Sequence, residues 1–494
     1  MRLPALAFLA ATLALPAAAQ TLRIGIGADP NVLDPAQSTS FVERVVFTAL
    51  CDRLLDVAPD LSFRPELATA WAWSDGGRTL RLTLREDGRF HDGTHLDAAA
   101  VKINLDRYRS APESRRKAEL RPITSVEAPD ARTVLIHLSQ PYAPLLSVLS
   151  DRAGMIMSPT ALARLGEKIR DEPVCSGPFR LVRRVAQDRI EMERVPEHWN
   201  AANIHAQRLV MLPIPDNTVR LLNLRAGQLD LVERVAPADV DTARQSPNVR
   251  IAEATAIAYQ NLYISTNGAL KDQRLREALE LSIDRDIINQ VALEGRFVAN
   301  NQPEAPGAPY YFKDLAAPPR DLERAKALLR EAGQPSPTFT LLTPNSPVES
   351  QVAQIIQAMA GEAGFKVKIE VLESSALVAR SERGAQYDAA FGIWSGRADP
   401  DGNIALWIAS DGFLNRTGYN SPKVDAAFNA AREITDPEKR RAFYHAAAEQ
   451  WMADRPMLIL YHYRWFWGMR TGLTGFEPSP DGLIRFSGLR LPPG

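Results

Sequence analysis

The stretch from residue 339 to residue 394 constrains the fold most, because strand and helix patterns alternate there. Phe339–Leu342 is a short apolar run typical of a strand, and residues 348–363 carry apolar side chains at helical spacing. The run 366–371 alternates polar and apolar residues, and a short helix and a further strand at 388–394 follow. Strands that alternate with helices predict a parallel sheet covered by helices.

The first half of the chain has a different pattern. Residues 80–85 alternate leucine with polar side chains, and residues 134–138 repeat the alternation. A period of two predicts half-buried antiparallel strands. Between them, Asp97 is placed to cap a helix with one apolar face over residues 101–108. We therefore expect an α/β protein with a β-rich first half and an α/β second half.

Length and charge limit the class of protein. A chain of 494 residues exceeds the size at which a single core stops growing, so two or three domains are expected. The 58 basic and 59 acidic side chains give a formal net charge of −1. Nucleic acid and anionic membrane surfaces favour a basic excess, so we expect neither as a partner.

The first twenty residues resemble a secretory leader. A short positive start precedes an apolar stretch from Leu3 to Leu15, and three alanines at 17–19 provide a small-residue cleavage pattern. We expect residues 1–20 to be removed and the mature protein to be periplasmic. The first cysteine, Cys51, is too far from the cleavage site for a lipid anchor.

The two cysteines, Cys51 and Cys175, leave two interpretations open. They could form a disulfide in an oxidising compartment, or both could be buried free thiols. Neither interpretation indicates catalysis or a metal site.

The motifs that suggest an enzyme are weak. His91 and His95 have the spacing of a helical zinc pair, but the Asp-Gly between them favours a turn. Residues 399–403 resemble the start of a calcium loop, yet the sixth and twelfth positions are Ile404 and Ser410 rather than Gly and Glu. The sequence lacks the G-x-S-x-G, P-loop and H-E-x-x-H motifs. We expect a binding protein without cofactor or metal, and not an enzyme.

Residues 70–107 read AWAWSDGGRTLRLTLREDGRFHDGTHLDAAAVKINLDR. This stretch resembles the signature of the family 5 extracellular solute-binding proteins, the peptide and nickel receptors of ABC importers. Further stretches resemble that family in the same order along the chain: Ser176–Phe179, Arg225–Asp230, Asn267–Arg285, Ala325–Gly333, Tyr387–Asp401 and Tyr419–Arg432. The resemblance therefore spans nearly the whole chain after the leader.

The resemblance implies a two-lobed periplasmic-binding-protein (Venus-flytrap) fold with an extra domain inserted near the N-terminus. On that basis lobe I combines residues 21–48, 170–258 and 470–494. The inserted domain II covers residues 49–169, and lobe II covers residues 259–469. Ligand would bind between hinged lobes and favour the closed state.

The resemblance also suggests which residues contact ligand. The segment Trp394, Ser395 and Gly396 matches the cleft edge that pairs with a peptide backbone in the family. The loop after Leu33-Asp34-Pro35 adds Ser38, Thr39 and Phe41. Tyr259 and Asn261 begin lobe II, and Asn415 and Tyr419 lie on a loop that faces ligand in related proteins.

Arg397 departs from the family pattern. Peptide-binding relatives tend to carry an acidic residue there, which pairs with the peptide ammonium. A guanidinium is instead a good bidentate partner for a carboxylate, while Asp399 is a candidate for the ammonium. The sequence does not decide which of the two anchors the ligand.

The first hypothesis is a receptor for a short peptide or peptide-like compound, which works with an ABC-importer permease and is itself a monomer. The alternative ligands are an oligosaccharide, an opine, an aromatic acid or a metal chelate. A secreted hydrolase is the third hypothesis, and it requires a catalytic group that the sequence does not reveal.

Overall fold

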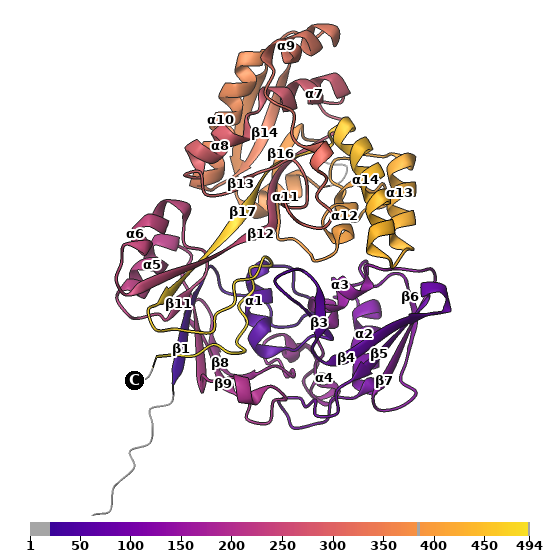
Figure 1. The fold of residues 1–494 in the computed structure, drawn as a ribbon, viewed down its shortest axis with the longest axis vertical. Coiled ribbons are helices and arrows are strands. Elements are labelled where there is room, and N and C mark those ends of the chain that lie inside the picture. The colour runs from indigo at the N-terminus through magenta and orange to yellow at the C-terminus, as the bar shows by residue number, and fades with distance from the viewer. Residues whose placement is uncertain (1–19, 383–385, 493–494) are drawn as a thin grey trace, which may run out of the picture.

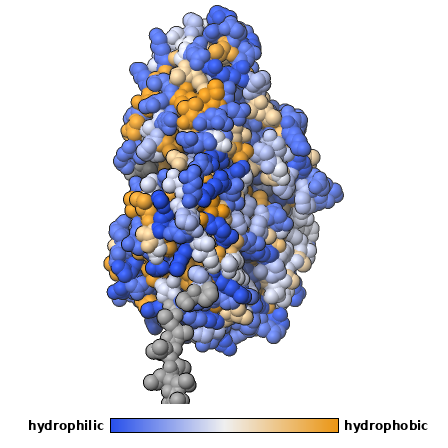
Figure 2. Space-filling view, turned by 60° about the vertical axis from the view of Figure 1, so that its left-hand side comes forward, coloured by the Kyte–Doolittle hydropathy of each residue, from blue (hydrophilic) through white to orange (hydrophobic). Residues whose placement is uncertain are grey.

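The computed structural model describes residues 20–382 and 386–492. The molecule is elongated, with an upper lobe formed by the C-terminal half and a broader lower part formed mainly by the first 258 residues (Figure 1). Figure 2 shows that most of the surface on the narrow side is hydrophilic, with a hydrophobic patch on the upper lobe. Residues 1–19 of the predicted leader lie outside the described residues. Within them, none of the helices combines the length and apolar character that a bilayer crossing requires.

One sheet of eleven described strands runs through both lobes. Its order is β15 (Lys366–Leu372), β14 (Thr338–Pro344), β16 (Ala389–Trp394), β12 (Val249–Ile264), β17 (Met457–Arg470), β11 (Leu231–Val232), β1 (Thr21–Ile26), β10 (Arg208–Pro213), β9 (Arg189–Arg194) and β8 (Phe179–Val185), with β13 (Val298–Ala299) beside β17. The neighbours β14–β15 and β14–β16 are parallel, which confirms the prediction for this region.

The antiparallel pair β12 and β17 connects the lobes (Figure 1). Residues 249–255 pair with 464–470 in the lower part, and residues 259–263 pair with 457–462 in the upper lobe. Between these stretches the register shifts, so that residues 256–258 of β12 face only Tyr463 of β17. Such a bulge bends a strand and increases its twist. The bulge marks the crossing from one lobe to the other.

Helices cover the upper part of the sheet. They are α7 (Gln273–Ser282), α8 (Arg285–Ala292), α9 (Leu322–Glu331), α10 (Pro347–Ala363), α11 (Ser374–Arg380), α12 (Ala405–Ile408), α13 (Pro422–Arg432) and α14 (Pro437–Asp454). Two apolar cores lie on the two faces, one beneath α7–α10 and one beneath α12–α14. The lower part adds α1 (Phe41–Leu50), α5 (Asn217–Arg225) and α6 (Val240–Arg244).

A separate sheet of four described strands forms the rest of the lower part. Its order is β4 (Ala68–Ser74), β5 (Thr79–Leu84), β7 (Thr133–Leu138) and β6 (Ile123–Glu127), flanked by β2 (Leu55–Val57), β3 (Phe63–Pro65), α2 (Ala98–Ser110), α3 (Leu145–Leu149) and α4 (Pro159–Leu165). The alternating runs at 80–85 and 134–138 pair as predicted, with Leu82 opposite Val134. Asp97 caps α2 through the backbone N–H of Ala100. The sheet has its own apolar core, which favours the predicted inserted domain, although the boundary at 49–169 stays a prediction.

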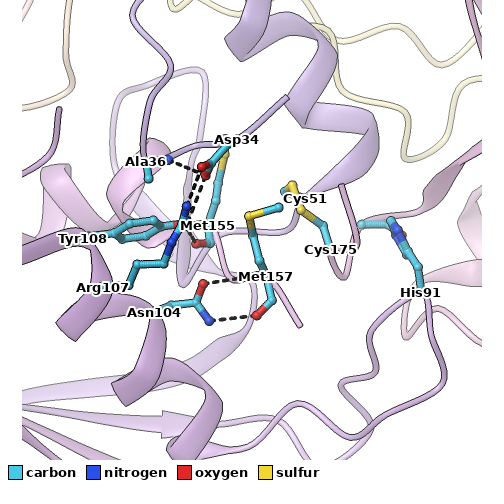
Figure 3. Close-up of a disulfide and its surroundings, with 11 residues drawn as sticks. Asp34, Ala36, Cys51, His91, Asn104, Arg107, Tyr108, Met155, Met157 and Cys175 are labelled. Carbon is cyan, nitrogen blue, oxygen red and sulfur yellow. Dashed lines mark hydrogen bonds and ion pairs between the residues drawn. A yellow bond between two sulfur atoms is a disulfide. The ribbon is translucent and has the colours of Figure 1, made fainter. Parts of the chain in front are cut away.

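A disulfide joins Cys51 and Cys175 and thereby answers the question that the sequence left open (Figure 3). Beside it, α2 is attached to the segment at 155–157 by hydrogen bonds. Tyr108 donates to the carbonyl of Met155 at 2.6 Å, and Asn104 bonds both backbone groups of Met157. The His91 ring lies 3.0 Å from the carbonyl oxygen of Gly177, and the His95 ring lies 2.9 Å from that of Glu86. The two histidines therefore stabilise loops separately.

We predict that the double variant Cys51→Ala, Cys175→Ala unfolds at lower urea concentration than the parent. The disulfide closes a loop with a sequence separation of 124. Removing such a cross-link typically costs about 2–5 kcal/mol of unfolding free energy, because the unfolded chain gains freedom. Urea unfolding with and without dithiothreitol measures the effect. Reductant should lower the parent's midpoint to that of the variant and leave the variant unchanged; equal midpoints throughout would contradict the prediction.

Candidate functional site

The upper lobe and the lower part touch across an interface that includes α3 and the loop after β16. The backbone N–H of Ala143 donates to the carbonyl of Arg432 at 2.8 Å, and that of Asp399 donates to the Ser147 hydroxyl at 3.3 Å. An ion pair joins Arg397 to Asp151 with 3.0 Å between Nε and Oδ2. The two parts therefore meet in a closed arrangement.

An inner cavity of about 60 Å³ lies at this interface. Side chains from both parts line it, among them Tyr142 and Asp151 from below and Trp394 and Arg397 from above. A larger cavity of about 390 Å³ adjoins it and shares Tyr142, Leu406 and Phe413 as lining residues. Half of Phe413 is exposed. The two cavities together form a path from solvent to the inner side chains.

Glu43 organises the loop at residues 38–40, which Arg116 and Arg152 contact through Ser38. Its carboxylate accepts hydrogen bonds from the Ser38 hydroxyl and from the backbone N–H groups of Thr39 and Ser40, each at 2.8 Å. Burial alone raises the pKa of Glu43, but these hydrogen bonds outweigh it and hold the pKa below its usual value. Ser40 in turn caps α1. The loop at 38–40 is thus fixed at the start of this helix.

Asp151 is the central anion of the lower wall. Its carboxylate contacts Arg44 of α1 at 3.0 Å, Arg397 at 3.0 Å and Arg152 at 3.7 Å. Burial raises the pKa of Asp151, yet Arg44, Arg397 and Arg152 together hold it well below the usual range. Asp151 therefore remains ionised at neutral pH.

Asn403 organises the upper wall. Its side-chain oxygen accepts from the backbone N–H of Arg397 at 2.7 Å and from the Trp394 indole at 3.2 Å. Its side-chain nitrogen donates to the Glu304 carboxyl at 2.7 Å, and its carbonyl accepts from the Tyr259 hydroxyl at 2.6 Å. These bonds fix the loop that carries Trp394 and Arg397. The Arg397 guanidinium lies 4.6 Å from the centroid of the Trp394 indole.

Asp399 is already paired. Its two carboxylate oxygens accept from Arg440 at 2.6 and 2.9 Å, and both side chains are buried. A bidentate pair of this kind is strong, and breaking it would leave a buried charge. Asp401 is likewise paired with Arg432 at 2.6 Å. A ligand ammonium would therefore have to displace Arg440 before it could use Asp399.

The structure brings some of the residues predicted from sequence together and keeps others apart. Arg397 contacts Asp151, whose neighbour Arg152 donates to the Ser38 hydroxyl at 3.3 Å. The Nη1 of Arg397 also lies 3.4 Å from the Ser395 hydroxyl. Phe41 stacks on Trp465, with 5.5 Å between ring centroids, and neither residue is among those that line the two cavities. Four residues lie inside the upper wall, away from both cavities: Tyr259, Asn261, Asn415 and Tyr419. Asn415 bonds the carbonyl of Tyr419, whose hydroxyl bonds Asp454.

Sequence analysis missed several residues of the interface, chiefly Arg44, Tyr142, Ser147, Asp151 and Arg152. They lie in α1, in the segment just before α3, in α3 and in the turn after α3, where charged and polar residues usually face solvent. A sequence signal for their role was absent, because Arg44 and Asp151 are 107 positions apart.

We predict that Glu304→Gln stabilises the protein above pH 7 and has little effect near pH 5. Burial, with a smaller contribution from Asp399, raises the pKa of Glu304 to about 7, while the bond from Asn403 lowers it. A raised carboxyl pKa removes stability as pH rises from the unfolded value through 7. Glutamine keeps the acceptor for Asn403 without a charge, so about 2–3 kcal/mol should be regained at pH 8. Chemical denaturation of both proteins at pH 5 and pH 8 tests this; a difference that does not depend on pH would contradict it.

We also predict that Gly396→Ala is destabilising. Gly396 has a φ of +80°, and an added Cβ would lie 2.4 Å from Cγ1 of Ile257 and 2.6 Å from its carbonyl oxygen. Strain and overlap together should cost about 2–3 kcal/mol. Gly361 in α10 is the matched control, because its Cβ would meet nothing within 4 Å. Gly361→Ala should raise the melting temperature slightly, whereas an unchanged melting temperature for Gly396→Ala would contradict the packing argument.

Comparison with known proteins adds three findings. Residues 62–415 match the family model described as bacterial extracellular solute-binding proteins, family 5 Middle. The glutathione-binding protein GsiB of Pectobacterium atrosepticum is 28% identical over 486 residues, which cover 95% of this chain and 94% of that protein. The fold is similar to that of DppA from Helicobacter pylori in complex with the peptide STSA, with a TM-score of 0.84 and 24% identity over 95% of this chain and 98% of that one.

A further solved structure with the same fold is AgaA from A. tumefaciens R10 in complex with agropinic acid. Its TM-score is 0.84 and its identity 22%, over 95% of this chain and 98% of that one. These likenesses confirm the predicted two-lobed α/β fold.

Proposed function

Because the chain belongs to the bacterial extracellular solute-binding proteins of family 5, we propose that it is the periplasmic receptor of an ABC importer and captures a short peptide or peptide-like solute between its lobes. The observation that carries the proposal is the inner cavity, which residues of both lobes line. One lining residue, Arg397, follows Gly396, which packs against Ile257 in the bulge of β12. The GsiB and DppA proteins bind glutathione and a peptide, respectively, which supports this ligand class.

Ligand entry requires the lobes to separate at the bulge. Sites for drug-sized ligands usually enclose about 300–1,000 Å³. The inner cavity of about 60 Å³ is too small for a peptide, so a ligand has to open the interface and move contacts such as Arg397–Asp151. A ligand that contacts both lobes then favours the closed state, because only that state offers all of its contacts.

The remaining roles follow from the sequence. We propose that residues 1–20 direct export and are removed, that the mature protein acts as a monomer without a cofactor, and that its partner is the membrane permease of the importer. We propose binding rather than catalysis as its activity.

A second candidate function keeps the receptor role but replaces the peptide by a non-peptide acid such as an opine. Arg397 favours this candidate, because a guanidinium suits a carboxylate better than an ammonium. The similar fold of AgaA in complex with agropinic acid also supports it. Oligosaccharides, aromatic acids and metal chelates remain alternatives of the same kind.

A thermal-shift screen of protein stripped of ligand by unfolding and refolding tests the proposal. The panel contains di- to pentapeptides, glutathione, oligosaccharides, opines, aromatic acids and metal chelates. We expect peptides or glutathione to raise the melting temperature, because a ligand at 100 times its dissociation constant adds about 2.7 kcal/mol of stability. A rise in melting temperature confined to non-peptide acids would favour the second candidate. An unchanged melting temperature with every compound of the panel would contradict both candidates.

Two tryptophan variants localise the binding. Trp394→Ala removes an indole that lines the inner cavity, and Trp73→Ala removes a partly buried indole from the separate four-stranded sheet. Both should lower the melting temperature without ligand. Only Trp394→Ala should reduce the shift that ligand produces, and equal reduction by both variants would contradict a site at this cavity.

A further inference from the structure

Four arginines gather around Asp151, and Asp151 and Arg397 line the inner cavity, while the other three lie behind Asp151. Arg44, Arg152 and Arg397 contact its carboxylate, and Arg116 pairs with Glu119, which also lines the cavity. Three of them come from the lower part, and Arg397 comes from the upper lobe. One carboxylate at the centre of this group cannot satisfy all the N–H donors that surround it.

Three unpaired nitrogens show that N–H donors outnumber acceptors in this cluster. The buried nitrogens Nη1 of Arg44, Nε of Arg116 and Nε of Arg152 have no hydrogen-bond partner. All three side chains are about 95% buried, so water does not readily replace the missing acceptor. A buried donor without an acceptor costs about 1–3 kcal/mol, and several in one place require an explanation.

The nearby acids do not balance the cations. Asp151, Glu119 and Glu43 belong to this cluster with the four guanidinium groups, and Asp481, which also interacts with Arg44, is paired with Arg485. Glu43 is already occupied by the Ser38 loop. The pairs Asp399–Arg440 and Asp401–Arg432 are neutral overall. Burial and the neighbouring guanidiniums of Arg116, Arg397 and Arg44 lower the pKa of Arg152 to about 9 despite Asp151, as a cation-rich cluster requires.

We propose that Arg44, Arg116, Arg152 and Arg397 form an oxyanion subsite for a ligand carboxylate, in which Asp151 acts as an internal competitor. This inference rests on the receptor role proposed above and specifies its substrate class. The ligand carries more carboxylates than ammonium groups. Among the described residues, four carboxylates line the inner cavity, and each has an arginine partner: Glu119, Asp151, Asp399 and Asp401. The site therefore favours a ligand carboxylate over a ligand ammonium group.

The subsite also couples recognition to closure. Arg397 belongs to the upper lobe, and the other three arginines belong to the lower part. A ligand carboxylate held between them contacts both lobes at once and therefore favours the closed arrangement.

Calorimetric titration of the full mature protein with size-matched probes tests the inference. The probes are trialanine, the tripeptide Glu-Ala-Glu, its fully amidated counterpart, glutathione, and the non-peptide dicarboxylate succinate. We expect Glu-Ala-Glu to bind at least tenfold more tightly than trialanine and than its amidated form. Since this comparison uses the parent protein, it does not depend on any variant folding.

Variants assign the selectivity to the cluster. Arg397→Gln should reduce the preference for Glu-Ala-Glu to less than threefold, and Arg397→Lys should retain part of it. Asp151→Asn should tighten the binding of Glu-Ala-Glu more than that of trialanine, because the internal competitor for ligand carboxylates is lost and Glu-Ala-Glu carries three of them. Arg324→Gln is the control, since Arg324 lies exposed on α9 and pairs with Glu331.

The outcomes separate the two proposals. Equal affinity for neutral and acidic tripeptides would overturn the oxyanion subsite and leave the peptide receptor intact. Binding of succinate that depends on Arg397, with no binding of any peptide, would support the subsite and reject the peptide ligand. Absence of binding by every probe would overturn both.

Discussion

The hydrogen-bonded pair of β12 and β17 is the constraint on which the rest of the molecule depends. These strands belong to both lobes, and the longest interruption of their ladder is at residues 256–258, with a smaller register shift between Gln260 and Asn261. A backbone ladder resists shear, so relative movement of the lobes has to concentrate where pairing is interrupted. Gly396 packs against Ile257 at this point, which places the Trp394–Arg397 segment next to the interruption. The position of the candidate site therefore follows from the position of the bulge.

Buried ion pairs determine which charged groups the interface between the lobes can accept. Removing charges from water is expensive, and such pairs often contribute little net stability. Two of them, Asp399–Arg440 and Asp401–Arg432, are well matched and hold the loop after β16 against α13 and α14. The cluster around Asp151 is unbalanced by comparison. Within one interface, the balanced pairs serve architecture, and the unbalanced group is the one suited to recognition.

Regular structure was predictable because each element carries its own local signal. Side-chain periodicity predicts the parallel strands β14–β16 and the antiparallel β5–β7 pair. The preference of aspartate for helix N-termini predicts the role of Asp97 as the N-cap of α2. The site was predictable only in part. The segment at 394–399 has a recognisable motif, whereas Asp151 and Arg44 meet only after folding. Tyr259 and Asn415 show the reverse case. The sequence motif predicts that they contact ligand, but their polar groups bond backbone carbonyls inside the upper wall.

The Cys51–Cys175 bond has a consequence for how the molecule responds to proteolytic cleavage. Since it connects the two ends of the segment that contains the four-stranded sheet, that segment is a covalently closed ring. A single cut at any exposed turn within the ring leaves both new ends attached to the same molecule. The sheet and its core can then remain assembled, because the severed strands stay at high effective concentration. Damage of this kind would be visible as a second fragment only after reduction.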